Sequence, residues 1–239
     1  MQEKTRLRII APVNTDAFNA RILDAVQPVI PPDFEVDIRN ISEGNNCIQN
    51  RYNLTQNAMG VVKLARETEL AGYGGIFVTD FDMCGVEAAR EVVDIPVIGG
   101  FRASAFTAMM LSQKFSIITI LESTLAMQLE HISCFGLSAN FASIRAIDCP
   151  VSELEDVDKV AELVLGECVK AVEGDGAQSF ILGCTGFIGI AARVREKLRQ
   201  KYGGFIPVMD PNMTAMGYLV LLARNGLSQS RRCYSKVEI

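Results

Sequence analysis

Two stretches of the chain, one in each half, follow the same pattern of residues. The first begins with Gly75–Asp80 (GIFVTD). A helical pattern comes next, and then Ile95–Gly100 (IPVIGG). The second begins with Ser179–Cys184 (SFILGC). A helical pattern again comes next, and then Ile206–Pro211 (IPVMDP). A repeat of this kind predicts a fold of two similar halves. Asp80 ends the first apolar stretch and Cys184 ends the second, so the repeat predicts that this carboxyl and this thiol lie at equivalent strand ends.

Short apolar runs alternate with longer helical patterns along the chain. The predicted strands are Arg6–Val13, Phe34–Ile41, Gly75–Thr79, Pro96–Ile98, Phe115–Ile120, Ala142–Ile147, Ser179–Leu182 and Pro207–Met209. The predicted helices are Asp16–Val26, Asn53–Ala71, Val86–Val92, Ala103–Leu111, Ser123–Cys134, Val157–Val172, Ile188–Gln200 and Ala215–Arg224. Continuous apolar strands that alternate with helices are typical of parallel sheets covered on both faces. The sequence therefore predicts an α/β fold with two similar lobes, each a parallel sheet flanked by helices.

The repeat also predicts how the chain is divided. We expect residues 1–99 together with 211–239 to form one lobe, and residues 100–210 to form the other. The lobes are expected to be related by a pseudo-two-fold axis, with the active site in the cleft between them, because ligands of open α/β sheets bind at the carboxyl ends of strands. The tail after Gly226 is polar and is expected to be loosely held.

Composition excludes several classes of function. Hydrophobic residues make up 49% and charged residues 21% of the chain, which is typical of a soluble globular protein. The net charge is −5 and Lys and Arg do not cluster, so we expect no nucleic-acid partner. The chain has no apolar run of the roughly 18 residues that a membrane span needs, and Met1–Arg8 does not resemble a signal peptide. We expect a cytoplasmic protein that acts on a small molecule and forms a homo-oligomer, without a membrane partner.

The cysteines do not follow a metal-binding or disulfide pattern. There are seven of them, at irregular spacing: Cys47, Cys84, Cys134, Cys149, Cys168, Cys184 and Cys233. No C-x-x-C pair occurs, and His131 is the single histidine. We therefore expect no zinc site and no disulfide framework. Most of the thiols are expected to be small buried hydrophobes, with one or two in a chemical role.

The segment Leu182–Gly186 (LGCTG) is the strongest local signal. Cys184 in this segment follows a predicted buried strand, and we expect it to lie at the N-terminus of a helix. Backbone N–H groups at a helix N-terminus favour a thiolate. Gly183 and Gly186 would let a ligand approach the backbone closely. A thiol poised in this way suits acid/base chemistry. The alternative is a buried cysteine in a tight turn between strand and helix.

Four segments in the right order carry a resemblance to a known family. GCTG at Gly183–Gly186, with an Ile-Pro-Val strand farther on, resembles the second cysteine motif of the Asp/Glu/hydantoin racemase superfamily. Gly75–Phe81, followed by GVEAARE, resembles the first cysteine motif of its hydantoin and allantoin racemase branch. Phe115–Thr119 resembles that branch's central strand, and Ala11–Thr15 resembles its substrate-binding turn. The resemblance spans nearly the whole chain.

The resemblance implies a cofactor-independent isomerase, a racemase or epimerase. Such an enzyme moves a proton at a carbon next to a carbonyl of a small amino-acid-derived, hydantoin-like or carboxylate substrate. The family uses two cysteines, but here Asp80 occupies the first position. Three possibilities follow: Asp80 is the second acid/base group, Cys84 has replaced it, or Cys184 acts alone, as in the family's arylmalonate decarboxylases, which are lyases. A binding protein without catalysis on the same scaffold is a further alternative.

An aspartate with its ordinary pKa near 3.9 is a weak base toward a carbon acid. Burial beside Phe77 and Phe81 would raise the pKa of Asp80 and strengthen it as a base. The alternative role for Asp80 is to cap the helix that follows, because Asp is favoured at helix N-caps. One residue can serve both purposes.

Several further side chains are candidates for substrate contacts. Asn14 and Thr15 follow the first strand and could hold a carboxylate or a ureido oxygen, or they could cap a helix. Arg102 could pair with a substrate carboxylate through two hydrogen bonds, or it could be a surface residue at a helix start. The remaining candidates are Thr79, Phe81, Thr119, Thr185 and Gly186.

Overall fold

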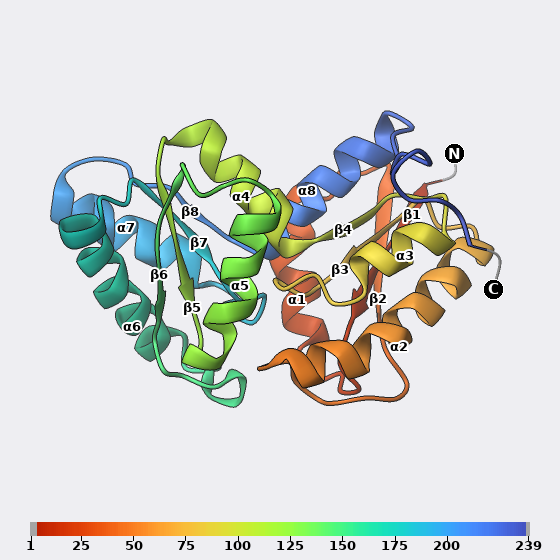
Figure 1. Cartoon of the computed structure of the whole chain (residues 1–239), viewed down its shortest axis with the longest axis horizontal. Helices are drawn as coiled ribbons and strands as arrows, with labels where there is room; N and C mark the ends of the chain where they lie inside the picture. Colours follow the sequence, from red (N-terminus) through yellow and green to blue (C-terminus); the bar gives the residue numbers. More distant parts are fainter. Residues whose placement is uncertain (1–3, 238–239) are drawn as a thin grey trace. The chain divides into compact units, whose positions relative to one another are not determined.

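The computed structural model of the chain describes residues 4–237 (Figure 1), so the charged start at residues 1–3 lies outside the described part. The chain divides into two compact units. Unit 1 comprises Met1–Gly100 and Asn212–Ile239, and unit 2 comprises Phe101–Pro211. Each unit holds one four-stranded sheet, and the two sheets have the same strand order.

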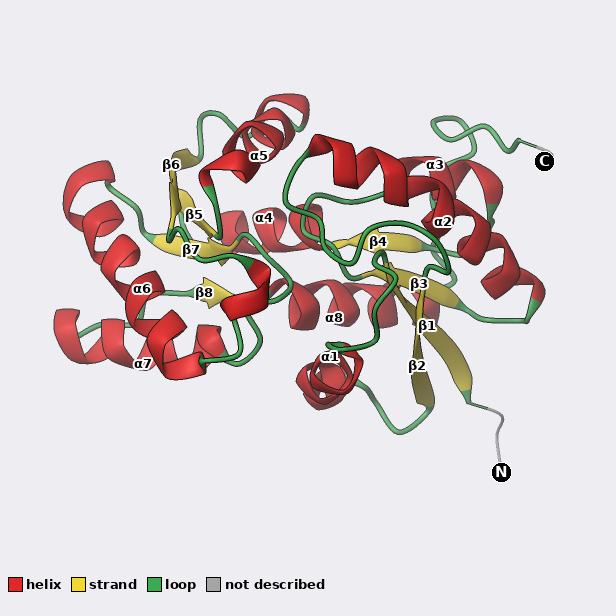
Figure 2. Ribbon diagram, turned by 90° about the horizontal axis from the view of Figure 1, so that it is seen from below, coloured by secondary structure: helices red, strands yellow, loops and turns green. Residues whose placement is uncertain are grey.

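Unit 1 is built on a parallel sheet with the order β2-β1-β3-β4. Its strands are β1 (Thr5–Ala11), β2 (Phe34–Asn40), β3 (Gly75–Val78) and β4 (Val97–Gly99). Its helices are α1 (Asn19–Val26), α2 (Arg51–Leu70), α3 (Val86–Val92) and α8 (Pro211–Arg224). Helices α2 and α3 lie on one face of the sheet, and α1 and α8 lie on the other (Figures 1 and 2).

Unit 2 repeats this arrangement with the parallel order β6-β5-β7-β8. Its strands are β5 (Phe115–Thr119), β6 (Phe141–Ala146), β7 (Ser179–Leu182) and β8 (Val208–Met209). Its helices are α4 (Gly100–Leu111), α5 (Glu122–Cys134), α6 (Val157–Lys170) and α7 (Ile190–Tyr202). Helices α6 and α7 lie side by side on one face of the sheet, and α4 and α5 lie on the other (Figures 1 and 2).

The repeat of two parallel sheets flanked by helices is therefore confirmed, and two helices belong to the unit that they do not follow along the chain. Helix α4 follows β4 of unit 1 along the chain but belongs to unit 2. Helix α8 follows β8 of unit 2 but belongs to unit 1, where a Cβ on Gly75 would lie 2.8 Å from the Leu219 side chain of α8. Each sheet is thus completed by the last helix of the other repeat.

The two central strands explain why these residues form buried parallel sheets. Every residue of β3 and of β7 is buried. Strands that helices cover on both faces need apolar side chains on both faces, which GIFV and SFIL supply apart from Gly75 and Ser179. The hydroxyl of Ser179 is hydrogen-bonded to Ser112 at 2.6 Å between the two oxygens, which satisfies it inside the core.

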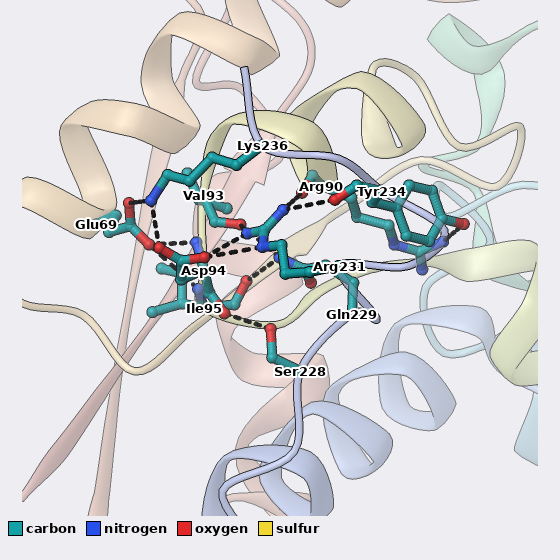
Figure 3. A network of polar contacts seen from close by, with 10 residues as sticks. All are labelled: Glu69, Arg90, Val93, Asp94, Ile95, Ser228, Gln229, Arg231, Tyr234 and Lys236. Carbon is teal, nitrogen blue, oxygen red and sulfur yellow. Dashed lines mark hydrogen bonds and ion pairs between the residues drawn. The ribbon is translucent and has the colours of Figure 1, made fainter. Parts of the chain in front are cut away.

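The polar tail does not behave as its composition predicts. Instead of being loosely held, it is tied to the turn between α3 and β4 (Figure 3). The side-chain amide of Gln229 donates to the carbonyls of Val93 and Ile95 at 2.6 and 3.0 Å. Arg231 donates to the carboxylate of Asp94 at 2.9 Å and to the carbonyl of Arg90 at 2.9 Å. These partners lie more than a hundred residues upstream, so local composition could not reveal them.

Candidate active site

Asp80 and Cys184 occupy equivalent positions in two turns of the same length. One turn joins β3, which ends at Val78, to α3, which begins at Val86. The other joins β7 to α7 in the same way, from Leu182 to Ile190. In both turns the candidate residue stands second, and in both the residue before the helix is a glycine in the left-handed region, with φ of 67° at Gly85 and 79° at Gly189. The repeat therefore extends from the strands into the turns that hold these two candidate residues.

Cys184 lies in the turn rather than at a helix N-terminus, so that expectation is wrong: α7 begins only at Ile190. The thiol is partly buried, and its Sγ accepts a hydrogen bond from the backbone N–H of Gly186 at 3.3 Å. The carbonyl of Cys184 accepts from the N–H of Phe187 at 3.2 Å. The N–H of Gly186 still favours negative charge on the sulfur, but this donor belongs to the turn and not to a helix.

Asp80 is buried, with 8% of its surface exposed. Its Oδ2 accepts a hydrogen bond from the N–H of Cys84 at 2.8 Å. Burial raises the pKa of the Asp80 carboxyl from 3.8 to about 6, although the N–H groups of Cys84 and Asp82 favour the charged form. The N-cap residue of α3 is Gly85, so Asp80 ties its own turn and does not cap the helix. The capping alternative is wrong.

Cys84 is fully buried, and its thiol donates to the carbonyl of Leu54 at 3.3 Å. Burial, together with the negative charges of Asp80 and Asp82, raises the pKa of this thiol far above its ordinary value. The Cys84 thiol is therefore held in its protonated form. Of the two candidates for the second acid/base group, the geometry favours the carboxyl over this thiol.

The neighbours of Asp80 are also buried. Thr79 donates from Oγ1 to Oδ1 of Asn212, at the start of α8, at 2.9 Å. Phe81 is 1% exposed and belongs to the core of unit 1. Both residues flank Asp80 in a buried turn, and burial is what raises the pKa of the Asp80 carboxyl.

Asn14 and Thr15 lie in the loop after β1. The Asn14 side chain is exposed, and its Nδ2 donates to the carbonyl of Gly44 at 2.7 Å. The carbonyl of Thr15 accepts from the side-chain amide of Asn40. Helix α1 begins at Asn19 and has Phe18 as its N-cap residue, so neither Thr15 nor Asp16 caps it.

A buried amide that sequence reasoning missed organises this loop. Asn57 of α2 is fully buried, and its Nδ2 donates to the carbonyl of Pro12 at 2.7 Å. Its Oδ1 accepts from the N–H of Asn45 at 2.8 Å, and the carbonyl of Asn45 in turn accepts from the N–H of Asn14 at 3.2 Å. Because Leu54 of α2 also accepts from Cys84, the start of α2 supports both the Asn14 loop and the Asp80 turn.

The remaining candidates belong to unit 2. Arg102 lies in the first turn of α4 with its guanidinium 4.8 Å from the ring centre of Phe135, a cation–π contact. Thr185 and Gly186 follow Cys184 and are partly exposed. Thr119 ends β5 and is fully buried, with its Oγ1 bonded to side chains of α5. Cys184, Thr119 and Gly186 thus gather at one end of this sheet, and Arg102 lies on α4.

A metal ion or a membrane-spanning helix would be a different kind of feature in the described residues 4–237. Within them, His, Cys, Asp and Glu side chains do not form a group of three or more that could hold a metal ion. In the same range, every helix is too short or too polar to cross a bilayer.

Known proteins resemble this chain in sequence and in fold. The profile of the family described as Asp/Glu/Hydantoin racemase matches residues 7–219. A hydantoin racemase of Rhizobium meliloti is 30% identical over 226 residues, which cover 94% of this chain and 91% of that protein. The structure of allantoin racemase from Klebsiella pneumoniae has a TM-score of 0.90 at 29% identity, with 99% and 95% of the two chains covered. An allantoin racemase from Pseudomonas fluorescens has a TM-score of 0.86 at 25% identity, with 98% of each chain covered.

Proposed function

The chain belongs to the Asp/Glu/hydantoin racemase family, in its hydantoin-racemase-like branch, and we propose that it is a cofactor-independent racemase whose acid/base pair is the Cys184 thiol and the Asp80 carboxyl. The racemase relatives support an isomerase. The observation that carries the assignment of the pair is the equivalence of the two turns, in which Asp80 and Cys184 stand at the same position and Gly85 matches Gly189.

The two groups suit proton transfer at neutral pH. An acid/base catalyst works best when its pKa lies near the working pH. Burial raises the pKa of the Asp80 carboxyl to about 6, which is closer to neutral pH than the pKa of an exposed aspartate. For Cys184, the N–H of Gly186 stabilises the thiolate. Burial makes the Asp80 carboxylate a stronger base, and the N–H of Gly186 makes the Cys184 thiolate a weaker one. The two groups are thereby brought closer in basicity.

The substrate is proposed to be a small hydantoin-like ring or a related amino-acid-derived carboxylate. The relatives named above are hydantoin and allantoin racemases. Hydantoins and allantoin share a ureide ring with a stereogenic C–H next to a carbonyl, which acidifies that hydrogen. The loop of Asn14 and Thr15 supplies polar groups for ureido or carboxylate oxygens, and Arg102 can pair with a carboxylate. The candidates Thr185 and Gly186 follow the thiol directly and are partly exposed.

The reaction needs two proton carriers. One group, as thiolate or carboxylate, takes the proton from the stereogenic carbon, and the C–H electron pair moves into the adjacent carbonyl to form an enolate. The other group, in its protonated form, gives its proton to the opposite face of that carbon, and the carbonyl re-forms. No electrons leave the substrate. The two groups end with exchanged protonation states, so the reverse reaction uses them in opposite roles.

A solvent-exchange screen tests this function. The protein is incubated in D2O with hydantoins, allantoin, amino acids and substituted malonates, while NMR follows deuterium entry and polarimetry follows optical rotation. Loss of rotation together with deuterium entry at the stereogenic carbon is the expected result for one of the cyclic ureides or carboxylates. If a malonate instead loses carbon dioxide and gives a single enantiomer of the product, the protein is a single-thiol lyase. If a compound binds but its C–H does not exchange with deuterium, the protein is a binding protein.

A further inference from the structure

Gln128 is a polar residue in a fully buried position. It lies on α5, and its exposed fraction is 0%. Removing an amide from water is unfavourable unless hydrogen bonds replace those it loses. Glutamine is also among the side chains that lose the most rotamer freedom when they are fixed. The contacts of this amide therefore indicate what its burial achieves.

The amide nitrogen of Gln128 donates in two directions. It donates to the carbonyl of Gly183 at 2.9 Å and to Oγ1 of Thr119 at 3.1 Å. The orientation of the amide is unambiguous, because a backbone carbonyl only accepts and so must face the NH2 group. Thr119 lies 2.9 Å from Oγ1 of Thr124, and Thr124 donates to the carbonyl of Leu121 at 2.8 Å. Oγ1 of Thr119 also donates to the carbonyl of Gly183 at 3.4 Å, so the network links Gln128 and the two threonines to the carbonyls of Gly183 and Leu121.

The carbonyl that Gln128 holds belongs to the peptide group directly before Cys184. The other side of Gly183 is also held, because its N–H donates to the carbonyl of Ile118 at 2.7 Å. The fit is close: a Cβ on Gly183 would lie 2.8 Å from Oε1 of Gln128 and 2.8 Å from Cγ2 of Ile117. Gln128 thus fixes Gly183 both by a hydrogen bond and by contact.

The Cys184 turn needs this outside support more than the Asp80 turn does. The Asp80 carboxylate binds the N–H of Cys84 within its own turn and so braces it. The Cys184 sulfur, a weaker acceptor than a carboxylate, binds the N–H of Gly186 at 3.3 Å. We propose that Gln128 is a positioning residue that orients the peptide before Cys184, so that the thiol stays aligned with the N–H of Gly186. The proposal rests on the proposed function only where it assigns this thiol a catalytic role.

The test compares Gln128→Met, which keeps the length of the side chain but donates no hydrogen bond, with Ser116→Ala. Ser116 is a matched control: it is fully buried in β5, and its hydroxyl bonds that of Ser143 at 2.8 Å, away from Gly183. Circular dichroism checks that each variant is folded. Iodoacetamide labelling of the peptide that contains Cys184, followed by mass spectrometry over a pH series, gives a readout that needs no substrate.

In Gln128→Met we expect the midpoint of the labelling profile to move to higher pH, because the thiolate loses its aligned N–H donor. The kcat on the substrate found by the screen should fall roughly 10- to 100-fold, as small misplacements of a catalytic group do, while KM changes little. Ser116→Ala should keep both the wild-type midpoint and the wild-type kcat. If Gln128→Met does not fold, Gln128→Glu takes its place and should shift the midpoint in the same direction.

If the labelling midpoint of Cys184 is unchanged in a folded Gln128 variant, the proposal is overturned. This holds even if the melting temperature of the variant falls, because the buried Gln128 would then serve stability alone. The same shift in Ser116→Ala would overturn it too. The two proposals fail separately. If no substrate is racemised, the labelling profile still tests the positioning role of Gln128, and if the profile is unchanged in an active enzyme, the acid/base pair stands without it.

Discussion

Asp80 and Cys184 stand at the same position of matching turns, but their surroundings act on them in different ways. The carboxyl of Asp80 is buried beside Phe81, so its neutral form is favoured and its pKa rises to about 6. The thiol of Cys184 is partly exposed and receives the N–H of Gly186. Buried charge lowers stability, so the Asp80 site should be recognisable in the free energy of unfolding as well as in activity.

The first prediction concerns Asp80→Asn and stability. The folded-state pKa of about 6 lies above the ordinary 3.8, so Asp80 contributes stability that is fully present below pH 3.8 and is lost as pH rises through 6. Asparagine carries no charge and keeps an oxygen that can accept from Cys84. At pH 8 the variant should therefore be more stable than the wild type, by up to roughly 2–3 kcal/mol. Urea unfolding at pH 8 and pH 4.5 checks this, since the difference should shrink at the lower pH. The same difference at both pH values would contradict it.

The second prediction concerns Cys184→Ser. Serine keeps the size of the side chain, but its hydroxyl is far less acidic than a thiol, so racemisation should fall by at least about 100-fold. Cys134→Ser is the control, because Cys134 is an exposed thiol of the same unit. It should retain wild-type turnover. Polarimetry measures both variants, and near-normal turnover in Cys184→Ser would remove this thiol from the mechanism.

Sequence reasoning identified the residues of the two turns but not those that support them. Asp80 and Cys184 stand out because each ends an apolar strand within a repeat. Gln128 and Asn57 are polar residues within helical patterns, and such residues usually face solvent. Their complete burial depends on packing between helix and sheet. The spacing of Asn57 with Val61 and Leu64 on one face of α2 was the available signal, since all three are buried.

Both turns end in a glycine with positive φ, but the space around the two glycines differs. A Cβ on Gly85 would lie 2.8 Å from the carbonyl oxygen of Ala58 and 2.9 Å from Cβ of Val61. A Cβ on Gly189 would meet Cγ1 of Val157 at an ordinary 3.9 Å. The Asp80 turn is therefore pressed against α2, whereas the equivalent glycine of the Cys184 turn has room around it.

The third prediction uses these glycines as a matched pair. Alanine at either position has an unfavourable left-handed backbone, which costs roughly 1–2 kcal/mol. Gly85→Ala must also displace backbone of α2, which adds roughly 1–3 kcal/mol, whereas Gly189→Ala adds little. Thermal unfolding should therefore show Gly85→Ala to be clearly the less stable variant. Equal melting temperatures would mean that the Asp80 turn is not braced by α2.

Elements were easier to predict than the turns between them. The pattern at Val86–Val92 predicts a helix, and α3 has these bounds. The expected start of α7 at Ile188 was too early, because Phe187, Ile188 and Ile190 all continue the apolar pattern while the left-handed Gly189 delays the helix. Hydrophobic periodicity reports which face is buried, but the conformation of a single glycine decides where a helix begins.

Unit 1 is built from two distant parts of the chain. The tail contributes to joining them: Arg231 and Lys236 both pair with Asp94, and these bonds lower the pKa of that carboxyl. The N–H of Val237 adds a hydrogen bond to the carbonyl of Glu91 at 2.8 Å. The tail therefore fastens the end of the chain to the connection between α3 and β4.

The fourth prediction compares two neighbouring arginines of the tail. Arg231 bonds Asp94 and three backbone carbonyls, so Arg231→Ala should loosen the tail and lower the free energy of unfolding by roughly 1–2 kcal/mol. Arg232 is exposed and serves as the control. Hydrogen exchange should become faster in residues 228–237 of Arg231→Ala and stay unchanged in Arg232→Ala. Equal exchange in the two variants would contradict the fastening role.

We propose that Asp80 and Cys184 exchange protons with the same carbon from opposite faces. The most direct measurement is deuterium wash-in, followed by NMR for each enantiomer separately, in wild type, Asp80→Asn and Cys184→Ser. Wild type should exchange both enantiomers and interconvert them. Each variant should lose interconversion, Asp80→Asn should retain exchange of only the enantiomer that Cys184 deprotonates, and Cys184→Ser should retain at most weak exchange of the other. Undiminished exchange of both enantiomers in Asp80→Asn would exclude Asp80 as the second proton carrier.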